Sequence, residues 1–94
     1  MAIEVDRLRE WVSEWNEEAL LADGFEEAVV GMCEKFGAVP VVAYDRDKCV
    51  EVLMKRDGID YEEAAEFFEF NVAGSYVGES TPVFLTLWSK DENG

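Results

Sequence analysis

The chain has 94 residues, 49% of them apolar, which is enough to build the core of one small domain. Its 22 acidic and 8 basic residues give a formal net charge of −14, and histidine is absent. This balance argues against direct nucleic-acid binding, which needs a basic patch to neutralise phosphates. It also excludes every mechanism that depends on an imidazole group.

We expect neither a targeting segment nor a membrane-spanning one. The first 18 residues hold eight charges, so the apolar segment of a secretory signal is missing there. The uncharged stretches of the chain are far shorter than a transmembrane helix. Cys33 and Cys49 form no CxxC motif, and one pair of cysteines is not the disulfide framework of a secreted mini-protein. These features predict a cytoplasmic protein without a membrane contact.

Helical spacing of apolar residues predicts two helices in the first 37 residues. The first covers residues 3–21 and ends before the Asp-Gly break at residues 23–24. The second covers residues 25–36, with Asp23 and Glu26 at the spacing of a capping box and Gly37 where a C-terminal glycine belongs. The stripe of this second helix consists of Phe25, Ala28, Val29, Met32, Cys33 and Phe36.

The rest of the chain predicts a strand, two helices and a second strand. Residues 39–44 are rich in β-branched side chains, and Pro40 suits a strand start or an edge. Asp45 can cap a third helix that ends at the Asp-Gly pair of residues 57–58. A fourth helix over residues 61–71 begins after Asp60, and its extra aromatic residues Phe67 and Phe70 predict that it is covered on two sides. Residues 82–88 form the last strand.

These elements predict an α+β fold in one domain, residues 1–88, followed by a polar tail over residues 89–94. Four amphipathic helices are expected to pack on a small antiparallel sheet. Because two strands alone are marginally stable, a third strand is expected from residues 76–77, from residues 3–5 or from a second subunit.

The order of signals occurs twice along the chain. A helix, an Asp-Gly break, a helix that starts with an aromatic residue and Glu-Glu-Ala, and a Pro-Val strand follow one another in each half. Either an ααβ duplication or the convergence of capped amphipathic helices explains this order. A duplication would place the two strands antiparallel to each other.

No motif predicts a metal, a cofactor or catalysis. A calcium-binding loop that starts at Asp45 would need Gly at its sixth position and Glu at its twelfth, where the chain has Val50 and Arg56. Residues 74–78 are rich in glycine, but they precede a strand rather than a helix, which is the wrong order for a phosphate loop. Cys33 and Cys49 lie on apolar stripes and are expected to be structural. We therefore expect a protein without a cofactor that is not an enzyme.

The distribution of acidic residues is the most informative feature of the sequence. Residues 1–70 hold 19 acidic and 7 basic residues, whereas residues 71–89 hold one charged residue, Glu79. Two predicted helices carry acidic stripes without lysines four residues further on, and such like charges destabilise a helix. Solubility or adaptation to salt is one explanation, and a surface for a basic partner is the other. The stripe residues are Glu10, Glu14, Glu17, Glu18, Glu62, Glu63, Glu66 and Glu69.

Residues 41–85 resemble a family of small phage and bacterial proteins to which no activity is assigned. The specific part is the string Phe-Glu-Phe-Asn-Val-x-Gly-x-Tyr-Val-Gly-Glu-x-Thr-Pro, from Phe68 to Pro82. The resemblance implies an intracellular and phage-borne setting. Small acidic phage proteins of this kind are often inhibitors of host machinery, including DNA mimics and anti-defence proteins.

Two functional hypotheses follow. In the first, the protein binds a basic, nucleic-acid-handling protein through its acidic helices. In the second, it is a non-catalytic homo-oligomer, a homodimer in the simplest case. Its acidic residues then serve solubility, and its uncharged last third, with Phe84 and Trp88, forms the interface.

Overall fold

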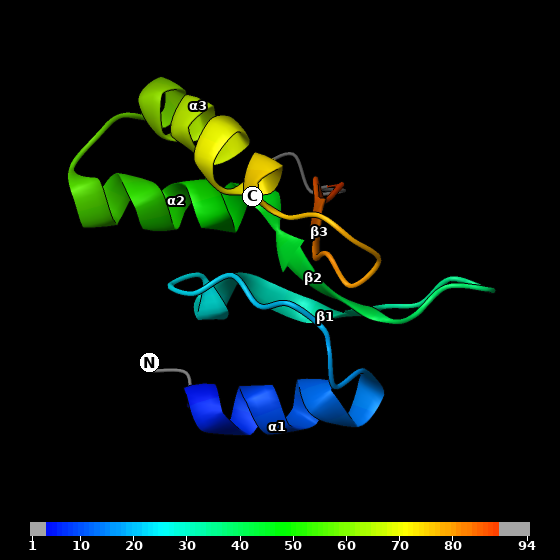
Figure 1. Ribbon diagram of the computed structural model, residues 1–94. Helices are drawn as coiled ribbons and strands as arrows, with labels where there is room; N and C mark the ends of the chain where they lie inside the picture. The colour runs from blue at the N-terminus through cyan, green and yellow to red at the C-terminus, as the bar shows by residue number, and fades with distance from the viewer. Residues whose placement is uncertain (1–3, 89–94) are drawn as a thin grey trace.

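The computed structural model describes residues 4–88 and shows a small α+β fold (Figure 1). Within these residues there are three α-helices, two single-turn 3₁₀ helices and one three-stranded sheet, so the prediction of four helices is wrong. In chain order the elements are α1 (Val5–Trp15), η1 (Glu26–Ala28), β1 (Val29–Cys33), β2 (Val41–Asp45), α2 (Arg46–Asp57), α3 (Tyr61–Asn71), η2 (Ala73–Ser75) and β3 (Val83–Leu85).

The sheet has the order β1-β2-β3 and is mixed, which corrects the predicted antiparallel sheet. β1 and β2 form an antiparallel hairpin, whereas β2 and β3 are parallel. Both α2 and α3 lie in the connection from β2 to β3, and a connection of this length can return the chain to the same end of the sheet. The third strand is β1 and comes from none of the three expected sources.

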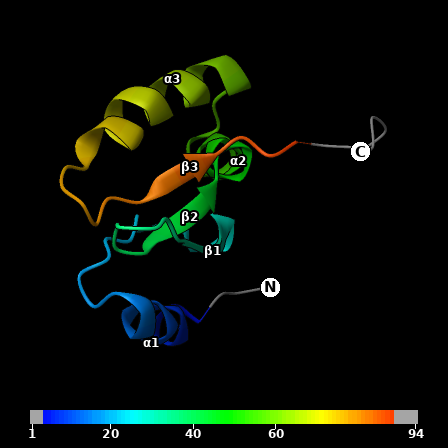
Figure 2. The ribbon, with the colours of Figure 1, turned by 90° about the vertical axis from the view of Figure 1, so that its right-hand side faces the viewer.

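The helices lie over one face of the sheet and beyond its two edge strands, β1 and β3. Side chains alternate along β2, so Val42 and Tyr44 point to one face of the sheet. On that face the Phe84 ring lies 5.5 Å from the Tyr44 ring and 4.9 Å from the ring of Phe68 on α3, between ring centroids. Figure 2 shows α3 beyond the β3 side of the sheet and α1 beyond the β1 side.

The helix predicted over residues 25–36 is a single 3₁₀ turn followed by β1. Phe25 and Ala28 are buried as the stripe requires, and the Gly24 N–H donates to the Glu26 side chain, but the helix goes no further. Gly31 has a φ of +154° at a β-bulge, a conformation that no α-helix contains. Pairing with β2 therefore overrides the helical spacing. Gly37, with a φ of +84°, lies in the hairpin turn rather than after a helix.

α1 ends at Trp15, six residues earlier than predicted, because Asn16 stops it. The Asn16 side-chain oxygen accepts a hydrogen bond from the Glu18 N–H at 3.0 Å, and its amide donates to the Pro40 carbonyl at 2.9 Å and to the Ser80 hydroxyl at 3.2 Å. Local side-chain bonds of this kind compete with helical bonds. Asn16 thus joins the end of α1 to the start of β2 and to the segment before β3.

The last two predicted helices are confirmed with their caps. The Asp45 carboxylate accepts from the Lys48 N–H at the start of α2, and the Asp60 carboxylate accepts from the Glu63 N–H at the start of α3. Gly58 ends α2 in the left-handed conformation, with a φ of +65°.

The ααβ duplication does not describe the fold. The first half contributes one helix and the β1–β2 hairpin, whereas the second half contributes two helices and a single strand. The two strands that a duplication would place antiparallel, β2 and β3, are parallel. Similar sequence signals therefore gave different structures in the two halves.

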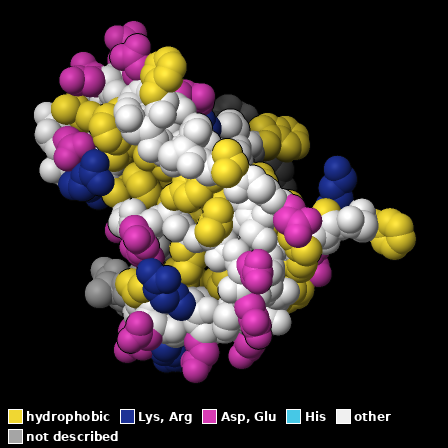
Figure 3. Space-filling view, in the orientation of Figure 1, with side chains coloured by type: hydrophobic (Ala, Val, Ile, Leu, Met, Phe, Trp, Pro, Cys, Tyr) yellow, Lys and Arg dark blue, Asp and Glu magenta, His cyan; other side chains and the backbone are white. Residues whose placement is uncertain are grey.

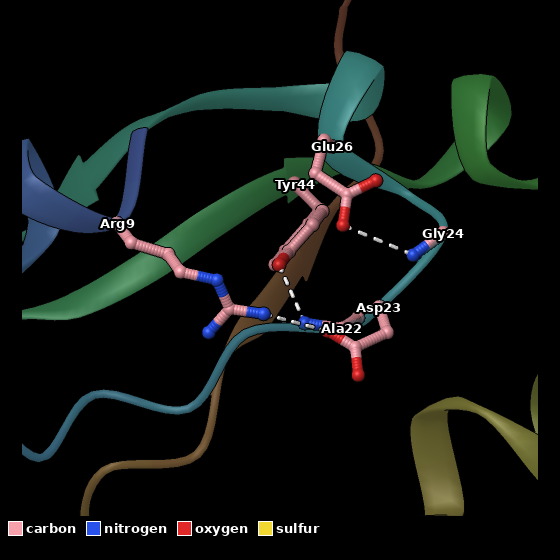
Figure 4. Close-up of polar contacts among 6 residues, drawn as sticks. All are labelled: Arg9, Ala22, Asp23, Gly24, Glu26 and Tyr44. Atoms are coloured by element: carbon pink, nitrogen blue, oxygen red, sulfur yellow. Dashed lines mark hydrogen bonds and ion pairs between the residues drawn. The ribbon is translucent and has the colours of Figure 1, made fainter. Parts of the chain in front are cut away.

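A buried tyrosine connects the sheet to the segment after α1 (Figure 4). The Ala22 N–H donates to the Tyr44 hydroxyl at 2.7 Å, and both residues are buried. Next to this bond, the Arg9 side chain reaches Asp23 at 3.2 Å and ties α1 to the same segment. The Tyr44 hydroxyl is thus the buried polar contact that holds residues 16–25 against the sheet, in addition to the bonds of Asn16.

Replacing Tyr44 with Phe is expected to lower the free energy of unfolding by about 1–3 kcal/mol, because the buried Ala22 N–H loses its acceptor. Urea denaturation measures this loss. Tyr76→Phe is the matched control, since the hydroxyl of this half-buried tyrosine forms no hydrogen bond to a described residue. Equal losses in both variants would contradict the role of the Tyr44 hydroxyl.

Stability is also expected to fall at alkaline pH. Burial raises the pKa of Cys49 from 9.0 to about 12 and the pKa of Tyr44 from 10.0 to about 12. The unfolded chain therefore loses these protons first, so the free energy of unfolding declines from about pH 9 up to about pH 12, by about 1.4 kcal/mol per pH unit and group. Urea titrations across this range test it. In Cys49→Ala the decline should begin near pH 10, and an unchanged onset would contradict the assignment to Cys49.

Candidate functional site

The structure divides the eight predicted acidic residues between the two ends of the molecule (Figures 1 and 2). Glu10 and Glu14 lie on α1, and Glu17 and Glu18 lie in the turn that follows it. The other four lie on α3, at the opposite end. In Figure 3 acidic side chains gather over α3 at the upper left and along α1 at the lower edge, with apolar surface between them. The eight residues therefore do not form one continuous surface.

Three of the α3 carboxylates form the stronger candidate, which we call the α3 acidic face: Glu62, Glu63 and Glu66. All three are exposed, and none lies within ion-pair distance of a Lys or Arg among residues 4–88. Together with Asp60, which caps the helix, they line an open hollow of about 450 Å³. This surface presents only negative charge at short spacing.

Glu69 differs from these three residues because it has a partner. Its carboxylate accepts from the Arg46 guanidinium at 2.7 Å, and this hydrogen bond raises the pKa of Arg46. The guanidinium also lies 5.4 Å from the centre of the Phe68 ring, so it joins α2, α3 and the core. The sequence predicts no partner for Glu69, because Arg46 is 23 positions away in the chain. Its role in the structure is to hold α3 against α2.

Two aromatic residues that were predicted to be covered are exposed beside the α3 acidic face. Phe70 is 76% exposed and Phe67 is 39% exposed. Since residues 63, 66 and 70 follow one another at helical spacing, the Phe70 ring lies on the same side of α3 as Glu63 and Glu66. The sequence showed the extra aromatic residues, but their exposure depends on how α3 packs. The candidate surface therefore combines unpaired carboxylates with an exposed ring.

The aromatic rings at the α1 end are each less exposed than Phe70. Trp11 and Trp15 are about two-fifths exposed, and their rings pack against each other edge to face at 6.5 Å. Trp11 follows Arg9 by two positions and therefore lies on the opposite side of the helix from the side chain that bonds Asp23. The outward side of α1 carries Glu10 and Glu14.

The two aromatic residues named for an oligomer interface have different surroundings. Phe84 is half-buried and packs between the rings of Tyr44 and Phe68. Trp88, four residues later, is 86% exposed. Only Trp88 is available for a contact with another molecule.

No group that could bind a metal is present in the described part of the chain. Asp45 serves as the cap of α2, and Cys49 is buried with a pKa of about 12, which keeps its thiol protonated. Cys33 is partly exposed and unpaired with Cys49. Among residues 4–88 no charged side chain is buried. What remains as a candidate is the exposed surface of unpaired carboxylates on α3.

In comparisons with known proteins, no family model matches the chain, and no curated protein or solved structure matches it significantly. The resemblance to small phage and bacterial proteins therefore stays an expectation. None of the helices in the described range is long and apolar enough to cross a membrane.

Neutralising the two neighbouring carboxylates Glu66 and Glu69 is expected to have opposite effects on stability. Glu69→Gln removes the negative charge that pairs with Arg46 and should lower the free energy of unfolding by about 0.5–1 kcal/mol. Glu66→Gln removes repulsion from Glu62 one turn away and should raise it by about 0.2–0.5 kcal/mol. Urea denaturation at low salt measures both. A loss of stability in Glu66→Gln would mean that Glu66 has a structural partner.

Proposed function

We propose that the protein is a non-catalytic binding protein whose α3 acidic face docks onto a basic surface of another protein. The observation that supports this most is the exposed Phe70 ring, 76% exposed, beside carboxylates that have no basic partner among residues 4–88. A solubilising surface needs the charges but not the ring. A docking surface uses both, because charge steers the encounter and the apolar ring provides contact area.

Local stability does not account for Glu66 and Phe70. Glu62 and Glu66 lie one turn apart on α3, and like charges at this spacing destabilise a helix by about 0.2–0.5 kcal/mol. An exposed Phe gains nothing from the fold, since its ring stays in water. Both features become favourable when a surface with Lys or Arg around an apolar depression covers them.

Because the acidic residues are divided between two ends of the molecule, only one set of them can mimic the charge of DNA in a partner's groove. α1 and α3 lie at opposite ends of the molecule, so one partner groove would contact one set of carboxylates (Figure 2). We propose that this set is the α3 acidic face and that the partner is a nucleic-acid-handling protein in the cytoplasm. The resemblance of residues 41–85 to small phage and bacterial proteins favours a host protein, with an inhibitor of DNA-mimic or anti-defence type as the corresponding role.

Reversing charge on α3 tests the proposal against a matched control on α1. Glu62→Lys/Glu66→Lys is expected to weaken capture of a basic protein from a bacterial lysate by about tenfold or more, because electrostatic steering is lost. Glu10→Lys/Glu14→Lys changes the net charge by the same amount at the other end of the molecule and should have little effect. Circular dichroism confirms that both variants fold.

Salt provides the second readout of the same experiment. Binding of the wild-type chain should weaken strongly between about 50 mM and about 500 mM NaCl. Salt screens the attraction between exposed charges that lie more than several ångströms apart. If no basic protein is retained at low salt, or if both double variants lose binding equally, docking through the α3 acidic face is wrong.

A further inference from the structure

One guanidinium of the protein is already bound by an aromatic ring and a carboxylate of α3. The Arg46 side chain comes from α2, and its guanidinium carbon lies 5.4 Å from the centre of the Phe68 ring. One of its terminal nitrogens donates to the Glu69 carboxylate at 2.7 Å. A ring and a carboxylate of the same helix therefore hold a single arginine, one by its face and the other by its N–H groups.

The outer side of α3 presents the same two kinds of group to solvent. Phe70 is 76% exposed, and the exposed residues Glu66 and Glu63 lie one turn and two turns before it. Side chains on a helix lean toward its N-terminus, so the Phe70 ring lies over the turn that carries Glu66. Their Cβ atoms are neighbours at about 5–6 Å, as for any pair four residues apart. Neither carboxylate pairs with a Lys or Arg of residues 4–88.

Arginine suits this combination better than lysine does. Its guanidinium is planar, so it can stack on a ring while its N–H groups donate to a carboxylate beside that ring. Its apolar stem also covers apolar surface, which gives the exposed Phe70 ring a contact out of water. A lysine ammonium is a compact, strongly hydrated charge, so it pairs with a carboxylate but gains less from the ring.

We propose that Phe70, together with Glu66 and Glu63, binds an arginine side chain of the partner protein. The inference rests on the docking of the α3 acidic face proposed above, and it names the residue type that this face recognises. The charges are complementary, since the face presents only carboxylates. Arginine is also the residue that nucleic-acid-binding surfaces use to recognise phosphate, so a partner of that class carries it where a mimic of DNA would dock.

Two matched peptides test the proposal: a capped Gly-Ser peptide with Arg at alternate positions, and the same peptide with Lys in place of every Arg. Binding is followed by NMR titration of the purified chain at about 50 mM NaCl, through the α3 backbone amides and the Phe70 ring signals. The two peptides carry the same charge, so a difference in affinity reports the shape of the cation. We expect the arginine peptide to bind about threefold or more tightly and to shift the ring signals.

Phe70→Leu keeps an apolar side chain but removes the aromatic face. It should lower the affinity for the arginine peptide about threefold and leave the affinity for the lysine peptide nearly unchanged. Phe36→Leu is the matched control, because Phe36 is a fully exposed ring in the turn of the β1–β2 hairpin, and it should change neither affinity. Both rings are exposed, so both variants are expected to fold, and circular dichroism verifies this.

The failure of this proposal is distinguishable from the failure of docking itself. Equal affinity for the two peptides overturns the recognition of arginine, and so does a preference for arginine that survives Phe70→Leu. In either case, loss of both affinities in Glu62→Lys/Glu66→Lys still supports docking through the α3 acidic face. If neither peptide binds, or if that double variant binds both peptides as well as the wild-type chain does, docking fails together with the recognition of arginine.

Discussion

The burial of β2 on both faces is the constraint on which the rest of the structure depends. Its residues Val41, Val42, Ala43 and Tyr44 are at most 8% exposed, although the strand belongs to a sheet of only three strands. β2 pairs with β1 on one side and β3 on the other, and its last residue, Asp45, caps α2. Tyr44 also holds residues 16–25 through Ala22. A change in this strand therefore disturbs the sheet, a helix start and a loop together.

Local signals predicted the helices of the second half of the fold. The prediction for the first half was wrong because it missed the pairing of β1 with β2. The caps at Asp45, Asp60 and Gly58 act within a few residues, so they can be read from the sequence. Residues 25–36 have helical spacing, but the spacing of Phe25 and Ala28 equally fits one 3₁₀ turn. Val29, Val30 and Gly31 favour a strand once β2 is available to pair with. That pairing, between positions up to 15 apart, is invisible to a window of a few residues.

The candidate site shows the same division between local and tertiary information. The sequence shows where every carboxylate lies along the chain, and the prediction combined the sets on the two helices into one surface. Only the packing reveals that the sets lie at opposite ends, that Glu69 bonds Arg46 from another helix, and that Phe70 stays exposed. Each of these facts depends on how α3 lies on α2 and the sheet. Sequence reasoning can therefore nominate charged residues, but it cannot decide which of them share a surface.

The helix dipole separates the carboxylates further. Glu62 and Glu63 lie in the first turn of α3, where negative charge is stabilised by about 0.3–1 kcal/mol each. That local benefit offers a structural reason for these two acids, whereas Glu66 lies one turn further on and receives little of it. Glu14 lies in the last turn of α1, where the dipole opposes it. Structural benefit alone therefore explains neither Glu66 nor Glu14. Of the two, only Glu66 lies at helical spacing from a ring as exposed as Phe70, which is why the docking surface is assigned to α3.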